Sequence, residues 1–149
     1  YSTMAKLSAG ENVNVNVLEN ICTNLTELLC ITEFYKLGYH VSIPYGENSN
    51  YDFIADIDNT LIRVQVKSAK KQPNDSYSFS GRHNNKCYDK ASIDYFATYF
   101  ENNCYLIPVN ECSTAKTLWK HTPKNNQIKN IHFADEYLLK TQVQKILQG

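Results

Sequence analysis

The sequence feature that most constrains the fold is a hairpin pattern, two short runs of alternating apolar and polar residues at Tyr51–Ile57 and Leu61–Lys67. This alternation is the period of a β-strand with one buried face. Between the runs stand Asp58 and Asn59, which tolerate the left-handed backbone that a two-residue hairpin turn requires. The segment therefore predicts two antiparallel strands around a tight turn.

A turn at these two residues fixes the register of the hairpin. Ile57 then pairs with Thr60 and, counting outward, Asp52 pairs with Gln65. Lys67 lies two residues beyond Gln65 and on the same face, because side chains alternate along a strand. The apolar residues of the two strands, Phe53, Ala55, Val64 and Val66, fall on the other face. The pattern predicts a buried apolar face and an opposite face where a carboxylate, an amide and an ammonium group converge.

This combination resembles a known nuclease family. An aspartate on one hairpin strand and Gln-x-Lys on the other, here Asp52 and Gln65-Val66-Lys67, is similar to the PD-(D/E)XK nuclease superfamily, in the variant where glutamine replaces the second acid. The segments that more narrowly resemble group I intron homing endonucleases of that superfamily are YGENSNYDFIAD, IRVQVKSAK, IDYFATY, CYLIPV and PKNNQIKNIHFADEYLL. The likeness runs from about Asn24 to the C-terminus.

The resemblance implies an α/β, restriction-endonuclease-like fold with a central mixed β-sheet flanked by helices. At 149 residues the chain is within the range of one domain, which we expect to span 1–149. Periodicity and turn residues predict a helix over 24–37 ending at Gly38, a strand over 39–43, an extended loop over 68–88, strands over 93–99 and 104–109, and a helix over 133–147.

The first 20 residues are left unassigned, as an N-terminal arm or an extra element. Val13, Val15 and Val17 alternate with asparagines, which is a strand period. A run this short is also compatible with part of a helix or with a flexible arm.

The resemblance implies metal-dependent hydrolysis of phosphodiester bonds. Asp52 would bind the metal directly and the backbone carbonyl of Val66 would be a second oxygen ligand. Lys67 would orient the attacking water and offset developing negative charge, while Gln65 would contact a metal-bound water or the scissile phosphate. A small number of hard oxygen donors favours Mg²⁺, for which Mn²⁺ can substitute.

The neutral Gln65 invites a compensating carboxylate elsewhere, and the resemblance places one on the first helix, at Glu27. A second interpretation comes from spacing, because Asn24 followed three residues later by Glu27 is also a capping box that closes a helix start. Spacing alone does not separate the two interpretations. The family pattern favours the metal role.

The formal net charge is zero, which argues against a protein that coats nucleic acid by bulk charge. Positive charge is nevertheless concentrated after the hairpin, with seven Lys and Arg against two Asp over residues 63–90. We expect Lys70, Lys71, Arg82 and Lys86 to contact DNA phosphates, which supply most sequence-independent affinity. His83 is a weaker candidate, because a lone loop histidine is usually solvated surface.

Other polar and aromatic residues carry less information. Tyr88, like Tyr51 and Tyr95, is expected to pack with its hydroxyl in water. The amides of residues 125–127 either meet adenine edges in a major groove or cap a turn. The five cysteines have no C-x-x-C spacing and predict neither a zinc site nor a disulfide framework.

The expected partner is double-stranded DNA, cut by a homo-oligomer, either a dimer or a tetramer, because a chain this small covers only a short length of duplex. No apolar run approaches the roughly 20 residues of a membrane span, and no signal pattern is seen, so we expect a cytoplasmic protein associated with the nucleoid through DNA.

The leading interpretation is a site-specific double-strand endonuclease. A structure-selective nuclease resembling Holliday junction resolvases would share this core. A module that binds DNA without cutting it is a third possibility, since Gln65 departs from the acidic consensus. The presence of both Asp52 and Lys67 argues against it.

Overall fold

The computed structural model of the protein describes residues 14–83, 86–123, 125, 128–129 and 131–149. Its main element is a five-stranded mixed sheet, in which β3 and β8 are parallel and the other neighbours antiparallel. In spatial order the strands are β1 (His40–Ser42), β2 (Phe53–Ile57), β3 (Thr60–Val66), β8 (Tyr95–Phe100) and β9 (Asn103–Pro108). The predicted central mixed sheet is confirmed.

The hairpin of β2 and β3 has the predicted turn and register. Ile57 pairs with Thr60 around Asp58 and Asn59, whose φ angles of 48° and 76° are left-handed. The four apolar residues expected inside, Phe53, Ala55, Val64 and Val66, are at most 3% exposed. The regular ladder ends at Phe53 and Val64, so the expected pairing of Asp52 with Gln65 is not part of it.

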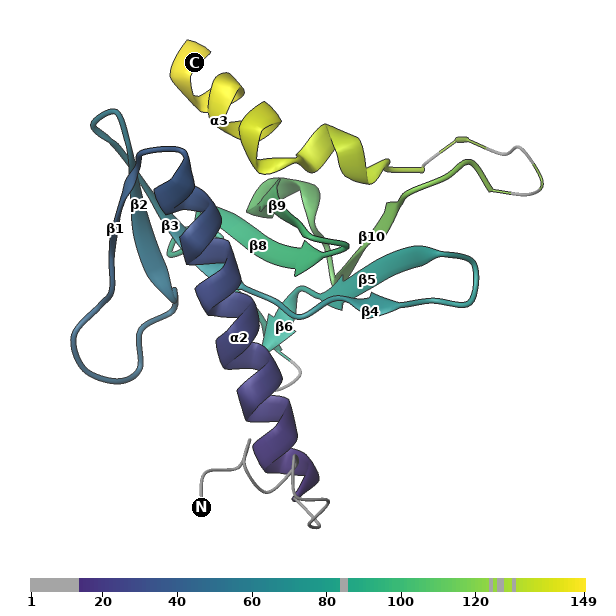
Figure 1. Ribbon diagram of the computed structural model, residues 1–149, viewed down its shortest axis with the longest axis horizontal. Helices are drawn as coiled ribbons and strands as arrows, with labels where there is room; N and C mark the ends of the chain where they lie inside the picture. The colour runs from purple at the N-terminus through teal and green to yellow at the C-terminus, as the bar shows by residue number, and fades with distance from the viewer. Residues whose placement is uncertain (1–13, 84–85, 124, 126–127, 130) are drawn as a thin grey trace.

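Two helices cover one face of the sheet (Figure 1), α2 (Val15–Lys36) and α3 (Leu139–Gln148). The first starts well before the predicted Asn24, because Asn14 caps it by accepting a hydrogen bond from the Asn16 N–H. The strand interpretation is therefore wrong for residues 15–17, and Val13 lies outside the described residues. The predicted end before Gly38, which has a φ of 89°, is confirmed.

The C-terminal helix starts later than predicted. Residues Ala134–Tyr137 form a 3-10 turn, and the extended backbone of Leu138 separates this turn from α3. The side chains of Leu139 and Val143 join Cys30 and Phe34 of α2 in a core over the β2–β3 hairpin. The helical layer therefore buries the face that carries the apolar hairpin residues.

The opposite face of the sheet is covered by a three-stranded sheet, ordered β10 (Ala115–Trp119), β5 (Ser76–Ser80) and β4 (Lys70–Lys71). A two-stranded hairpin, β6 (Arg82–His83) and β7 (Lys86–Cys87), follows β5. The expectation of a loop over 68–88 is therefore wrong. Tyr77 and Phe79 alternate with serines and bury against Phe96 and other residues of β8 and β9 in a second core.

Neighbouring residues of β8 separate the two cores, since Phe96 belongs to the second core and Ala97 to the first. Layers of helices, mixed sheet and small sheet result, which confirms the α/β restriction-endonuclease-like fold class. Within the described part of the chain, no helix is long and apolar enough to cross a membrane.

Candidate active site

Asp52 lies immediately before β2, where the chain leaves the regular ladder. Its N–H donates to the Val64 carbonyl at 2.8 Å, and its Oδ2 accepts from the Val66 N–H at 2.8 Å. These two bonds hold the carboxylate against the end of β3. Burial raises the pKa of Asp52, and the Val66 N–H and the positive charge of Lys67 oppose that rise in part.

Glu27 lies in the middle of α2 and is half-buried. Its pKa is raised by burial and, second, by the negative charge of Asp52, so the two carboxylates are within electrostatic reach of each other. The capping-box interpretation is wrong, because Asn24 is itself an interior helix residue and the helix is capped by Asn14. The fold thus places Glu27 in electrostatic reach of Asp52, and its metal-binding role stays a prediction.

Lys67 follows β3 directly and its ammonium group is held at a defined place. The Nζ atom donates to the Arg82 carbonyl oxygen at 2.9 Å and lies 4.4 Å from the centre of the Tyr88 ring. Burial lowers the pKa of Lys67, and the negative charge of Asp52 offsets part of that shift. The ammonium therefore lies in a partly dry setting near the carboxylate.

Tyr88 is the residue of this cluster that the sequence did not indicate. It packs edge-to-face on Phe96 with ring centroids 5.5 Å apart, which confirms the expected packing role, but its face also covers Lys67. Burial, and next the charge of Asp52, raise the pKa of Tyr88 to about 12, so the hydroxyl stays neutral at ordinary pH. No local pattern predicts this contact, because it depends on where the chain returns after the β6–β7 hairpin.

Gln65 is half-buried on the same face of β3 as Lys67. Its Nε2 is 3.5 Å from the Val66 carbonyl oxygen, a long contact that leaves the amide beside the predicted carbonyl ligand. Arg63, two residues earlier, is bound to Asp94 by three hydrogen bonds of 2.8–3.0 Å and joins β3 to the start of β8. The charge of Arg63 is therefore paired with Asp94 and stabilises the fold.

The donor chemistry of this cluster fits a hard divalent cation. Asp52 and Glu27 offer carboxylate oxygens and Val66 offers a carbonyl, and a few such donors suit Mg²⁺, which keeps several of its waters. A cation would also relieve the repulsion between the two partly buried carboxylates. Among the described residues, no three His, Cys, Asp or Glu side chains are grouped as a metal site, so the protein donors alone are few.

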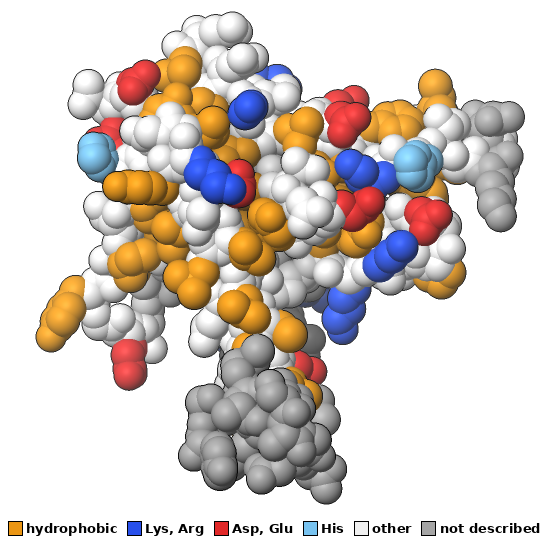
Figure 2. All heavy atoms as spheres, in the orientation of Figure 1, with side chains coloured by type: hydrophobic (Ala, Val, Ile, Leu, Met, Phe, Trp, Pro, Cys, Tyr) orange, Lys and Arg blue, Asp and Glu red, His pale blue; other side chains and the backbone are white. Residues whose placement is uncertain are grey.

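The four residues expected to contact phosphates all lie on the short strands that follow Lys67. Lys70 and Lys71 are on β4, Arg82 on β6 and Lys86 on β7, and all four are exposed. Figure 2 shows Lys or Arg side chains over the β4 region. Lys71 also forms an ion pair with Asp75 at 3.5 Å. His83 is exposed on β6, with its ring 6.1 Å from that of Tyr88.

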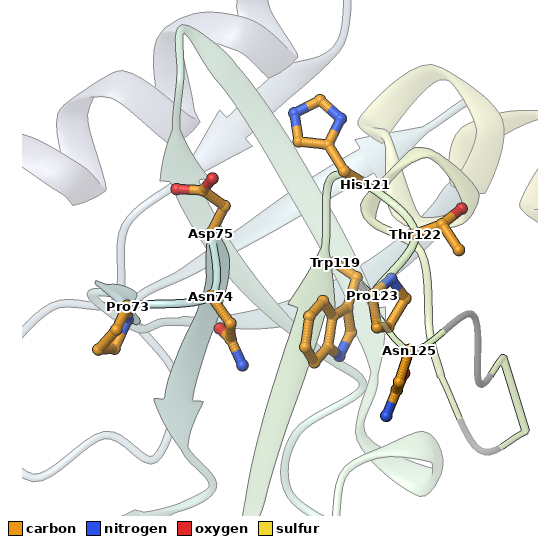
Figure 3. A pocket seen from close by; sticks show the side chains of 8 residues that line it. All are labelled: Pro73, Asn74, Asp75, Trp119, His121, Thr122, Pro123 and Asn125. Atoms are coloured by element: carbon orange, nitrogen blue, oxygen red, sulfur yellow. The ribbon is translucent and has the colours of Figure 1, made fainter.

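A cavity of about 610 Å³ lies apart from the carboxylate and lysine cluster. It opens between the turn joining β4 to β5 and the segment after β10 (Figure 3), lined among others by Asn74, Trp119, His121 and Asn125. Asn126 and Gln127 lie outside the described residues, so their expected role stays a prediction.

Comparison with known proteins identifies the fold and the family. The fold is similar to that of a bacterial homing endonuclease, I-Ssp6803I, with a TM-score of 0.66 and 23% sequence identity, over 87% of this chain and 91% of that chain. No curated protein matched the chain significantly. The family model described as PD-(D/E)XK endonuclease matches residues 21–140, which include Glu27, Asp52, Gln65 and Lys67. The chain therefore belongs to the PD-(D/E)XK endonuclease family.

Proposed function

We propose that this protein is a divalent-metal-dependent endonuclease that cleaves both strands of duplex DNA at a specific site. The observation that carries the proposal is that Asp52, held at the end of the β2–β3 hairpin by the Val66 N–H, is in electrostatic reach of both Glu27 and Lys67, in a member of this endonuclease family. A DNA substrate would place the protein with the nucleoid in the cytoplasm.

The proposed metal site consists of Asp52, Glu27 and the Val66 carbonyl. A bound Mg²⁺ or Mn²⁺ would polarise the phosphate and lower the pKa of the attacking water. The hydrogen bond from the Val66 N–H orients the Asp52 carboxylate before any ligand arrives. Gln65 is neutral, so we assign its amide to a water or to the scissile phosphate.

Lys67 supplies the positive charge next to the reacting phosphate. Its ammonium is already positioned by the Arg82 carbonyl and the Tyr88 ring, so little reorganisation is needed when negative charge develops. Because the group is partly desolvated, its interaction with that charge is stronger than it would be in water. We assign Lys67 and Asp52 as catalytic residues and Tyr88 as a positioning residue.

Phosphates away from the cut would be held by Lys70, Lys71, Arg82 and Lys86. These side chains project from short strands next to Lys67, and each phosphate neutralised releases condensed counterions from the duplex. The Arg82 residue then has two roles, because its backbone carbonyl holds Lys67 while its side chain faces solvent.

Cleavage of both strands needs two such sites, and each chain would contribute one proposed site. The outer face of α2, away from Cys30 and Phe34, exposes Leu25, Leu28 and Leu29 by 47%, 59% and 41%. Figure 2 shows hydrophobic side chains along this helix. We assign this face to contact with a second copy, in a dimer or tetramer. Light scattering should give a lower mass for Leu28→Glu than for wild type, and an unchanged mass would exclude Leu28 from the contact.

The decisive experiment compares wild type with Lys67→Ala on duplex DNA in Mg²⁺, with mapping of the ends. Lys67→Ala should bind DNA nearly as well, because one of several positive charges is lost, yet cleave far more slowly. Cleavage by the variant at the wild-type rate would refute the catalytic assignment. A branched DNA junction added as competitor tests the alternative of a structure-selective nuclease, and wild type that binds DNA without cutting it would indicate a binding module.

A further inference from the structure

The small sheet of β4, β5 and β10 has one apolar face and one polar face. Tyr77, Phe79 and Leu118 bury into the second core. The register places Lys70, Ser78 and Thr117 in one row across the three strands, on the opposite face. Trp119 pairs with Ser76 in the next row. The outer face therefore carries Lys70 at its β4 edge, serine and threonine hydroxyls on β5 and β10, and one indole at its end.

This outer face is hollowed along its length. A cavity of about 550 Å³ is lined by Gln72, Ser78 and Thr117, and it shares Asn74 and Trp119 with the cavity of about 610 Å³ at the end of the sheet. Figure 3 shows Asn74 and Trp119 lining the latter from different segments. The two cavities are therefore neighbours, one over the outer face and one at the end of the sheet, and we call them together the groove.

The cavity over the sheet is lined by neutral side chains, whereas Asp75, at the end of the sheet, forms an ion pair with Lys71 at 3.5 Å. The Gln72 Nε2 donates to the Ser78 Oγ at 2.9 Å. The Gln72 side-chain carbonyl and the Thr117 hydroxyl make no side-chain hydrogen bond with any residue that the structure describes. Neutral amides and hydroxyls are the groups that meet base edges, whereas lysine and arginine dominate phosphate contacts.

The dimensions of the sheet suit a DNA groove. Strands lie about 4.8 Å apart, so β5 and β10 with their side chains form a ribbon that enters a major groove about 12 Å wide. Alternate residues on a strand are about 6.8 Å apart, close to two base-pair steps of about 3.4 Å. The exposed Lys70 and Lys71 at the β4 edge are placed for the flanking phosphates.

We propose that the outer face of the β4–β5–β10 sheet reads base edges in the major groove, with Gln72 and Thr117 as specificity-determining residues. This inference rests on the proposed function and deepens it, because it separates the surface that recognises sequence from the cluster that cuts. We assign duplex DNA as the ligand. The hydroxyl and amide groups of the outer face suit base edges, and the lysines at the β4 edge suit phosphates.

The test is selection of bound duplexes from a randomised DNA library, with Ca²⁺ in place of Mg²⁺, by wild type, Gln72→Ala and Thr117→Val. Gln144→Ala, at an exposed position on α3, is the matched control. Each groove variant should lose discrimination at one or two base pairs by roughly five- to 150-fold. Thr117→Ser, which keeps the hydroxyl, should restore much of the preference at its position. Lys70→Ala should instead weaken binding to all sequences alike.

A second measurement needs no variant. The wild-type protein should protect guanine N7, a major-groove atom, from methylation within its selected site. The inference is overturned if wild type selects no preferred sequence, if the groove variants select the same sequence as wild type, or if N7 is unprotected. These measurements need no cleavage. Failure of the catalytic assignment would appear only in the cleavage rates of wild type and Lys67→Ala.

Discussion

Removal of the Tyr88 ring should slow cleavage without weakening DNA binding. The Lys67 ammonium lies 4.4 Å from the ring centre, a geometry worth about 0.5–2 kcal/mol. Since about 1.4 kcal/mol is tenfold in an equilibrium, Tyr88→Leu should reduce the fraction of correctly placed Lys67, and so the single-turnover rate at saturating DNA, by roughly two- to thirtyfold. Tyr88→Phe keeps the ring and should stay within about twofold of wild type.

The control for packing is Phe96→Leu. Phe96 contacts Tyr88 edge-to-face but is not the residue over Lys67, so this variant should lower stability while the folded protein still cuts at nearly the wild-type rate. All rates are compared at a temperature where melting curves show full folding. A wild-type rate in Tyr88→Leu would refute the positioning role. Equal slowing in Tyr88→Phe would show that the hydroxyl, and not the ring, is what matters.

Three further predictions concern charge. Asp52→Asn should raise the melting temperature in EDTA, because it removes a partly buried charge that repels Glu27, and Mg²⁺ should stabilise wild type but not the variant; a lower melting temperature in EDTA would contradict this. Asp94→Asn should lower the free energy of unfolding at neutral pH by roughly 1–2 kcal/mol. Because the hydrogen bonds from Arg63 lower the pKa of Asp94, the difference between variant and wild type in urea unfolding should disappear as the pH falls through that lowered pKa. A difference that does not change with pH would refute the contribution of the ion pair. Each of Lys70→Ala and Arg82→Ala should flatten the salt dependence of DNA binding by about 0.9 of a slope unit, and an unchanged slope would remove that residue from the interface.

Local patterns determined the hairpin and most of what it carries. The alternation of apolar and polar residues in β2 and β3 predicted which face is buried and that Gln65 and Lys67 share the other face. The turn predicted the register, because Asp58 and Asn59 tolerate a left-handed backbone. These features depend on residues close in sequence, so the sequence alone is enough to predict them. The family pattern added Glu27, which spacing alone left undecided.

The tertiary structure decided what depends on distant partners. The serines that alternate with Tyr77 and Phe79 were interpreted as a loop, because their strand pairs with the nearby β4 over two residues only and depends mainly on β10, much later in the chain. The sequence did not predict the start of α2, because valine and asparagine have weak helix preference. Inside the helix, the hydroxyls of Thr23 and Thr26 donate to carbonyl oxygens four residues earlier.

The surroundings of Lys67 show the same division. The sequence predicted that this lysine belongs to the site, since its face follows from the strand period. The Arg82 carbonyl and the Tyr88 ring that hold it come from the β6–β7 hairpin and the residue after it, and no local signal marks either contact. The sequence by itself determined which polar groups share the hairpin face. Only the tertiary structure decided how the Lys67 ammonium is buried and held, because burial depends on chain segments that meet only in the folded protein.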